Sequence, residues 1–154
     1  MAKRSIRFEG EEILTKKSKV VKKIDDRIKT IIDDMKETMI EENGVGLAAP
    51  QIGLLKRIIV IYSQEDDKTT VLINPEITTR EGEQTGEEGC LSLPGIAATI
   101  CRPLKVVVEA LDENGEDIEI SAEEYMARII CHEIDHLDGY TIRDRAIEIR
   151  KEED

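Results

Sequence analysis

The segment His132-Glu133-Ile134-Asp135-His136 constrains this chain more than any other feature, because it contains the only two histidines among 154 residues. On a helix, residues four apart share a face with Cβ atoms about 6 Å apart, so both imidazoles can reach one ion. Random placement would set two histidines four apart roughly once in a hundred tries, which makes packed or surface histidines the weaker interpretation. Glu133 is too close in sequence to be an easy third ligand, but it borders the ion and can take a proton from a bound water. The pattern H-E-x-x-H therefore predicts a helical metal site with a carboxylate base.

A catalytic ion also needs a third protein ligand and an open position for water. Peptidases of the extended H-E-x-x-H-x-x-G-x-x-H type are excluded, because Gly139 fits that pattern but Ile142 stands at the next ligand position. A more distant downstream acid would have to be Glu148, Glu152 or Glu153, near the chain end, with little structure to fix it. A ligand upstream of the helix is the better interpretation.

Cys90, within the segment Glu87-Glu-Gly-Cys-Leu-Ser-Leu-Pro94, is the best candidate for the third ligand. Glycine makes the backbone there flexible enough to bring the thiolate against a helix. A free cysteine is most often a small buried apolar residue, but the glycine before Cys90 and the polar Ser92 after it argue against a plain core position. Cys101 and Cys131 lie within apolar stretches and are interpreted as core residues.

The loop Gly44-Val-Gly-Leu-Ala-Ala-Pro-Gln51-Ile-Gly53 is the third feature with chemical meaning. Its glycines permit close backbone approach to another chain or a ligand, and Gln51 supplies an amide able to donate to a developing oxyanion. The loop follows a predicted helix rather than a strand and lacks the G-x-G-x-x-G spacing. A nucleotide-binding loop is therefore not supported.

Two helices are predicted. The apolar spacing indicates one from Val21 to Met39, ended by Asn43-Gly44, whose charged residues, Asp34 among them, form a solvated face. Ser121-Ala-Glu-Glu124 has the spacing of a capping box, so a second helix is expected from there to about Leu137, with Gly139 past its end.

Strands fill the middle of the chain in this prediction. They are expected over Arg57–Tyr62, Val71–Asn74, Ile77–Arg80, Ala97–Cys101, Lys105–Leu111 and Asp117–Ile120, with a hairpin at Asn114-Gly115. The fold class is α+β: mostly antiparallel sheets packed around a C-terminal metal-binding helix, with an N-terminal helix. One domain is expected over residues 1–154, with a frayed tail at 150–154.

The net charge of -12 and the 3% aromatic content oppose direct nucleic-acid binding, because phosphates would be repelled and few side chains could stack on bases. Apolar runs such as Arg57–Tyr62 fall far short of the roughly 20 residues of a membrane span, and no secretory signal is evident. Three cysteines form an odd, sparse set that suits a reducing cytosol better than a disulfide framework. A cytoplasmic protein without membrane attachment is expected.

Three segments, in this order, resemble the peptide deformylase family: Gly44-Val-Gly-Leu-Ala-Ala-Pro-Gln51, Glu88-Gly-Cys-Leu-Ser92 and His132-Glu-Ile-Asp-His-Leu-Asp-Gly139. Glu12–Val21 also resembles the family's opening stretch, so the resemblance covers nearly the whole chain. One departure is Cys131, where the family usually has Gln just before the first histidine. This position is not a ligand, so the difference concerns how the surroundings tune the metal ligands.

The resemblance implies that the chain hydrolyses the formyl group from the N-terminal methionine of new polypeptides and releases formate. It implies metal ligands at Cys90, His132 and His136, a base at Glu133, and oxyanion donors at the Gln51 side-chain amide and the Leu91 backbone amide. Substrate contacts are expected from Gly44, Val45, Gly46, Glu88 and Ile129. Glu88 is also expected to pair with Arg102 and so to pin the Cys90 segment.

One thiolate with two imidazoles suits Fe(II), Zn(II), Ni(II) or Co(II). The resemblance implies Fe(II) in the cell, while zinc, nickel or cobalt can replace it in purified protein because iron beside a thiolate is open to oxidation. N-formylmethionyl peptides are the expected partners. The ribosome stays open as a partner, since many bacterial members continue into a C-terminal docking helix and only a few residues follow Ile149 here.

Two alternatives remain at this point. The first is an endopeptidase that cuts internal peptide bonds with the same helix. The second is a non-catalytic module in which a structural ion is closed by a fourth protein ligand, which would be Asp135, Asp138 or Cys131.

Overall fold

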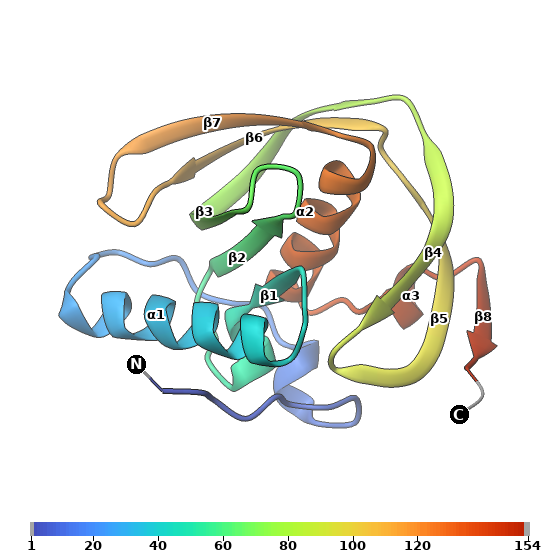
Figure 1. The fold of residues 1–154 in the computed structure, drawn as a ribbon, viewed down its shortest axis with the longest axis horizontal. Helices are drawn as coiled ribbons and strands as arrows, with labels where there is room; N and C mark the ends of the chain where they lie inside the picture. The colour runs from blue at the N-terminus through green and yellow to red at the C-terminus, as the bar shows by residue number, and fades with distance from the viewer. Residues whose placement is uncertain (1, 153–154) are drawn as a thin grey trace.

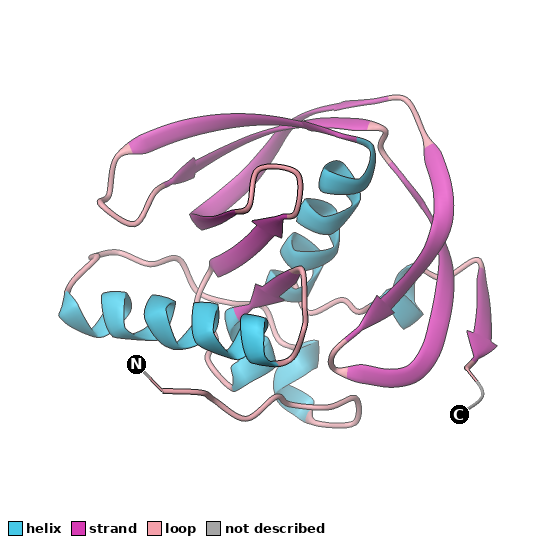
Figure 2. Cartoon of the chain, viewed as in Figure 1, coloured by secondary structure: helices cyan, strands magenta, loops and turns pink. Residues whose placement is uncertain are grey.

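Two antiparallel sheets and three helices make up the structure, a computed structural model that describes residues 2–152. One sheet has the strand order β1-β2-β3-β6-β7 and the other the order β4-β5-β8. The strands are β1 (Gly46–Ala48), β2 (Ile58–Ser63), β3 (Lys68–Glu81), β4 (Gln84–Cys90), β5 (Leu93–Arg102), β6 (Lys105–Leu111), β7 (Asp117–Glu123) and β8 (Glu148–Lys151). The helices are α1 (Asp26–Glu41), α2 (Glu124–Leu137) and α3 (Ile142–Arg145), with 3-10 turns η1 (Glu12–Thr15) and η2 (Ala49–Ile52) (Figure 2). The predicted α+β class is confirmed.

The five-stranded sheet lies between α1 and α2. Successive side chains of a strand point to opposite faces, and in β2 Ile59 and Ile61 join the apolar cluster under α2 while Ile58 and Val60 join the one under α1. Figure 1 shows α2 between this sheet and the β4–β5 hairpin. The metal helix is therefore covered on both sides, and its polar side chains are held within the fold.

Helix α1 begins at Asp26, five residues after the predicted start at Val21. The Asp25 side chain caps it by accepting a hydrogen bond from the backbone N–H of Ile28 at 3.1 Å. Val21 is buried as the periodicity indicated, but its backbone pairs with the side-chain amide of Asn74, at 2.8 and 2.9 Å, rather than with a helical turn. The apolar spacing on which the prediction depended therefore extends beyond the helix, because a distant side-chain amide takes up the backbone groups of Val21.

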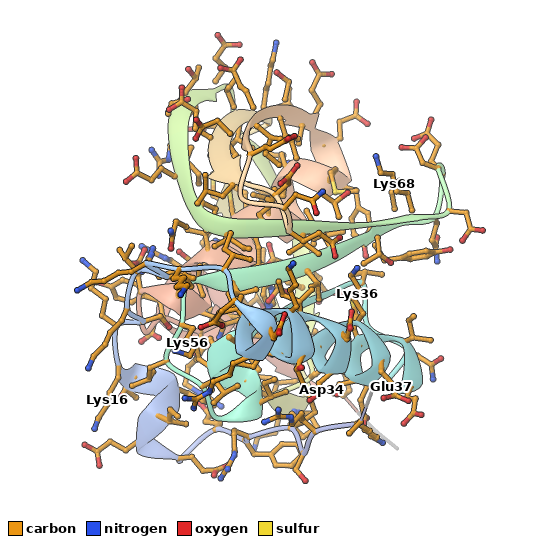
Figure 3. The ribbon with its side chains drawn as sticks, turned by 90° about the vertical axis from the view of Figure 1, so that its left-hand side faces the viewer. Lys16, Asp34, Lys36, Glu37, Lys56 and Lys68 are labelled. Atoms are coloured by element: carbon orange, nitrogen blue, oxygen red, sulfur yellow. The ribbon has the colours of Figure 1, made fainter. Side chains whose placement is uncertain are left out.

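The expected solvated face of α1 is wrong at one position. Asp34 is buried and accepts hydrogen bonds from the backbone of Ala2 and the side chain of Arg4. Lys36 leaves the helix on another side (Figure 3). It forms an ion pair with Glu113 in the β6–β7 turn. Asp34 thus fastens the N-terminal segment along the helix.

The two predicted strands at 71–74 and 77–80 are parts of one strand, β3. Its register shifts between Ile73 and Glu76, where Asn74 takes a positive φ of 53°, but pairing with β6 resumes beyond this point. The hairpin at Asn114-Gly115 is confirmed, because Gly115 has a φ of 82° between β6 and β7.

The predicted capping box at Ser121 is wrong. Ser121 stays in β7 and pairs with Val107 of β6, and α2 starts at Glu124 without a side-chain cap. The predicted end of the helix at Leu137 is confirmed. Gly139 follows with a φ of 85°, and a Cβ there would lie 2.6 Å from the carbonyl oxygen of Thr15.

The predicted frayed tail is also partly wrong. Arg150 and Lys151 belong to β8 and pair with Ala97 and Ile96 of β5, while residues 153–154 lie outside the described part of the chain. Across residues 2–152, none of the helices has the length and apolar character that crossing a bilayer requires.

Candidate metal centre

The structure brings Cys90, His132 and His136 to one point. One donor atom from each lies within 4.8 Å of the others, and the Cys90 sulfur is 3.3 Å from Nε2 of His136. Tetrahedral coordination with the usual metal–sulfur and metal–nitrogen bond lengths would separate sulfur from nitrogen by about 3.5 Å. Both imidazoles come from α2, and the sulfur comes from the end of β4. This donor set fits a single transition-metal ion.

Glu88 on β4 orients the first imidazole. Its carboxylate accepts hydrogen bonds from Nδ1 of His132 at 3.0 Å and from the Arg102 guanidinium at 2.9 and 3.0 Å. Burial opposes its ionisation, but the hydrogen bonds from His132 and Arg102 outweigh this and lower the pKa of Glu88 to about 2. A charged acceptor on Nδ1 leaves Nε2 of His132 for an ion. The expected Glu88–Arg102 pair is present.

Arg128, which the sequence analysis missed, is the second cation on Glu88. It is buried in α2 and donates to the Glu88 carboxylate and to the backbone carbonyls of Ile100 at 3.3 Å and Gln84 at 3.4 Å. These bonds join the metal helix to both strands of the β4–β5 hairpin. The signal in the sequence was an arginine within the apolar run 127–131, since a charge in such a place needs a buried partner.

Gln51 and Leu91 both line the pocket near Cys90. Nε2 of Gln51 is 3.7 Å from that sulfur, and Leu91 follows Cys90 directly in the β4–β5 turn. Gln51 is buried as the third residue of the 3-10 turn η2, and it lines the pocket. The Gln51 side-chain amide therefore lies beside the candidate metal centre, and Leu91 lines the same pocket.

Glu133 is buried beside the ligands. Its Oε2 is 4.0 Å from Nε2 of His132, and its Oε1 is buried without a hydrogen-bond partner among the described residues. Burial, opposed by the charge of His132, raises the pKa of Glu133 to about 7. Gly46 makes room for this carboxylate, because a Cβ there would lie 2.6 Å from Oε2. A proton can thus be taken up and released here near neutral pH.

A pocket of about 410 Å³ opens beside the ligands. All residues predicted for the site line it except His136, which is buried behind the others. The residues of the lining that the prediction lacked are Asn43, Glu87, Gly89, Tyr125 and Arg128. Val45, Ile129, Leu91 and Tyr125 give part of its wall an apolar character.

Two of the three side chains considered as a fourth, closing ligand form ion pairs with arginines, and the third is held as a neutral thiol. Asp135 accepts hydrogen bonds from Arg102 and Arg145, and Asp138 forms an ion pair with Arg57 at 3.0 Å. Burial raises the pKa of the Cys131 thiol to about 11, which disfavours the thiolate that binds metals. The arrangement therefore leaves one side of the centre open to the pocket.

Comparison with known proteins decides the family. The family model described as "Polypeptide deformylase" matches residues 3–152. The chain belongs to this family. A relative named peptide deformylase, from Acetivibrio thermocellus, is 54% identical over 154 residues, which are all of this chain and 89% of the relative.

Solved structures agree. A peptide deformylase from Ehrlichia chaffeensis in complex with actinonin superposes with a TM-score of 0.93 at 36% identity, over 96% of this chain and 91% of that one. A Met-Ala-Ser-bound class I type b peptide deformylase from Acinetobacter baumannii has a TM-score of 0.88 at 34% identity, over 93% and 98% of the two chains. The chain is accordingly a metal-dependent hydrolase that removes N-terminal formyl groups. The endopeptidase and the non-catalytic module are not favoured.

Proposed function

We propose that this chain removes the formyl group from the N-terminal formyl-methionine of new polypeptides, releasing formate, with an ion held by Cys90, His132 and His136. The observation that carries the proposal is the convergence of these three donors beside the buried carboxylate of Glu133. We place the enzyme in the cytoplasm, where its substrates are made. The ribosome is a further candidate partner.

Fe(II) is the ion expected in the cell, and Zn(II), Ni(II) or Co(II) can replace it in purified protein. One thiolate and two imidazoles suit all four ions, and the orientation of His132 by Glu88 supports the site. When bound, such an ion lowers the pKa of a water molecule and polarises a carbonyl oxygen.

Glu133 carries the proton. Its carboxylate takes a proton from the attacking water. The same carboxyl later delivers this proton to the leaving amine of methionine. Burial raises the pKa of Glu133 in the metal-free protein above that of an ordinary carboxyl, which favours holding the proton between the two transfers. Its position beside His132, rather than among the ligand atoms, supports this role.

Gln51 and Leu91 stabilise the oxyanion by donating hydrogen bonds. As water adds to the formyl carbon, negative charge develops on the formyl oxygen, and the Gln51 side-chain N–H and the Leu91 backbone N–H donate to it. One such donor typically contributes about 10² to 10³ in kcat. The place of both groups on the pocket wall next to the Cys90 sulfur supports the assignment.

The methionine side chain enters the apolar part of the pocket, between Val45 and Ile129. Gly44 and Gly46 let the substrate backbone pair along the loop in strand fashion. Glu88 borders this space from β4 but acts through His132. The Acinetobacter baumannii structure named as bound to Met-Ala-Ser supports a peptide that begins with methionine.

Formate release tests the proposal. Protein purified without oxygen is given formyl-Met-Ala-Ser, and formate and bound metal are measured on the same sample. Turnover with about one ion per chain is expected, and casein should stay intact. Rapid cleavage of casein without release of formate from the formylated peptide would contradict the proposal and would favour an endopeptidase instead.

A further inference from the structure

The side-chain amide of Gln51 is held at both ends. Its Oε1 accepts a hydrogen bond from the backbone N–H of Ala48 at 2.9 Å, and its Nε2 donates to the hydroxyl of Ser92 at 3.1 Å. A primary amide has two N–H donors. With one of them on Ser92, the other is left for the side where the Cys90 sulfur lies, 3.7 Å away.

The two anchors fix different properties of the amide. The Ala48 N–H decides which end is the oxygen, because a flipped amide would set two donors against each other there. The Ser92 hydroxyl decides the direction of the two N–H bonds, since rotation of the amide plane would break that bond. Gln51 and Ser92 are 1% and 0% exposed, so this hydrogen bond is shielded from bulk solvent.

Ser92 is itself fixed within the fold. Its carbonyl oxygen accepts a hydrogen bond from the backbone N–H of Glu9 at 2.8 Å, and with Leu91 it forms the turn that directly follows Cys90. The backbone carbonyl of Gln51 accepts a second bond from the same N-terminal segment, from Arg7 at 2.7 Å. The hydroxyl therefore joins two segments whose backbones are already held in register.

We propose that Ser92 is a positioning residue: its hydroxyl holds one N–H of Gln51 and so aims the second N–H, which faces the Cys90 sulfur, at the developing oxyanion. This inference rests on the proposed function, in which Gln51 donates to the oxyanion. Ser92 does not touch the reacting atoms. Its loss should affect the transition state more than substrate binding, because the oxyanion forms only as water adds to the formyl carbon.

If Ser92 only satisfied a buried hydrogen bond, its replacement would lower stability but would have no specific effect on kcat through Gln51. A double-mutant cycle separates the two roles. It uses wild type, Ser92→Ala, Gln51→Ala and the double variant, all loaded with the same metal, with kcat, KM, metal content and melting temperature measured for each.

We expect Ser92→Ala to lower kcat about tenfold with KM changed less than about twofold, a partial loss of the 10² to 10³ that a donor supplies. In the Gln51→Ala background the same change should alter kcat by less than about twofold. An equal factor in both backgrounds, or an effect on KM alone, would overturn the inference. No formate from wild type would instead refute the proposed function, and an unchanged kcat in Gln51→Ala would refute the role of Gln51.

A measurement on the wild type covers the case in which Ser92→Ala does not fold. In zinc-loaded protein labelled with ¹⁵N, the Gln51 side-chain amide is identified by its absence from the spectrum of Gln51→Ala. One of its two protons should exchange with solvent far more slowly than those of an exposed Gln such as Gln64. Exchange of both protons at the rate of Gln64 would contradict the proposed anchor.

Discussion

The carboxylate of Glu88 lies 3.0 Å from Nδ1 of His132 and joins β4, which ends in one metal ligand, to α2, which carries the other two. Two arginines share that carboxylate, one from β5 and one from α2 itself. The pair of cations keeps a buried anion compensated while it orients the imidazole. The relative placement of sulfur and imidazole therefore depends on this ionic cluster as well as on apolar packing.

Arg128→Met should cost about 3–5 kcal/mol of unfolding free energy, because removing one partner leaves part of a buried charge uncompensated. It should also weaken metal binding about 10- to 100-fold, as changes behind a metal ligand usually do. Urea unfolding of the metal-free protein and competition with a chelator measure the two effects. Arg145→Met is the matched control, since that exposed arginine pairs with Asp135 and should contribute less than about 1 kcal/mol. Equal losses in both variants would argue against the special role of Arg128.

Glu133→Gln should abolish most turnover while leaving the ion in place. The amide keeps the shape of the side chain but cannot accept the proton, and a general base typically contributes 10² to 10⁴ in rate. Formate release and metal content are measured on the same preparation. Metal bound with undiminished turnover would show that Glu133 is not the base.

Gly46→Ala should lower kcat by about 100-fold or more, because the new Cβ would lie 2.6 Å from Oε2 of Glu133 and displace the base. Gly86→Ala is the control, since its Cβ would meet only the Arg128 side chain at an ordinary 3.5 Å. The kinetic comparison is made at equal metal loading. Similar kcat values for the two variants would mean that Glu133 adapts to a side chain at position 46.

The protonation of Glu133 should depend on the ion. In metal-free protein its carboxyl is expected to titrate near pH 7, because burial raises its pKa from the usual 4.5. The sign follows from linkage: a carboxyl with a raised pKa binds its proton more tightly in the folded state, so stability falls as pH rises from 4.5 through 7. Glu133→Gln should lose this part of the pH dependence.

Carboxyl ¹³C NMR of the metal-free protein measures this pKa, with Glu133→Gln to assign the signal. Adding zinc should lower the pKa, since a nearby positive charge favours the carboxylate. Titration near pH 4.5 in the metal-free state would show that the carboxyl is hydrated and not buried.

The ligands could be predicted because their signals are local or compositional. Two histidines four apart on a helix need no tertiary information, and Cys90 stood out through its glycine-containing segment. The hairpin at Asn114-Gly115 was equally local, since only a few residue types tolerate its backbone conformation.

The features that were missed depend on partners far away in sequence. Val21 leaves the helical pattern because of Asn74, and Ser121 stays in a strand because β6 offers it a partner. Arg128 gains its role from Glu88, 40 residues earlier. Such long-range pairing overrides local propensity, and even where a buried arginine indicates that a partner exists, the neighbouring residues do not identify that partner.

X-ray absorption at the zinc edge of the zinc-loaded protein reports which atoms bind the ion and so tests the proposed ligand set. We expect one sulfur at about 2.3 Å and two imidazole nitrogens at about 2.0–2.1 Å, with the sulfur lost in Cys90→Ala. A wild-type spectrum without sulfur, or one in which the sulfur persists in Cys90→Ala, would contradict it.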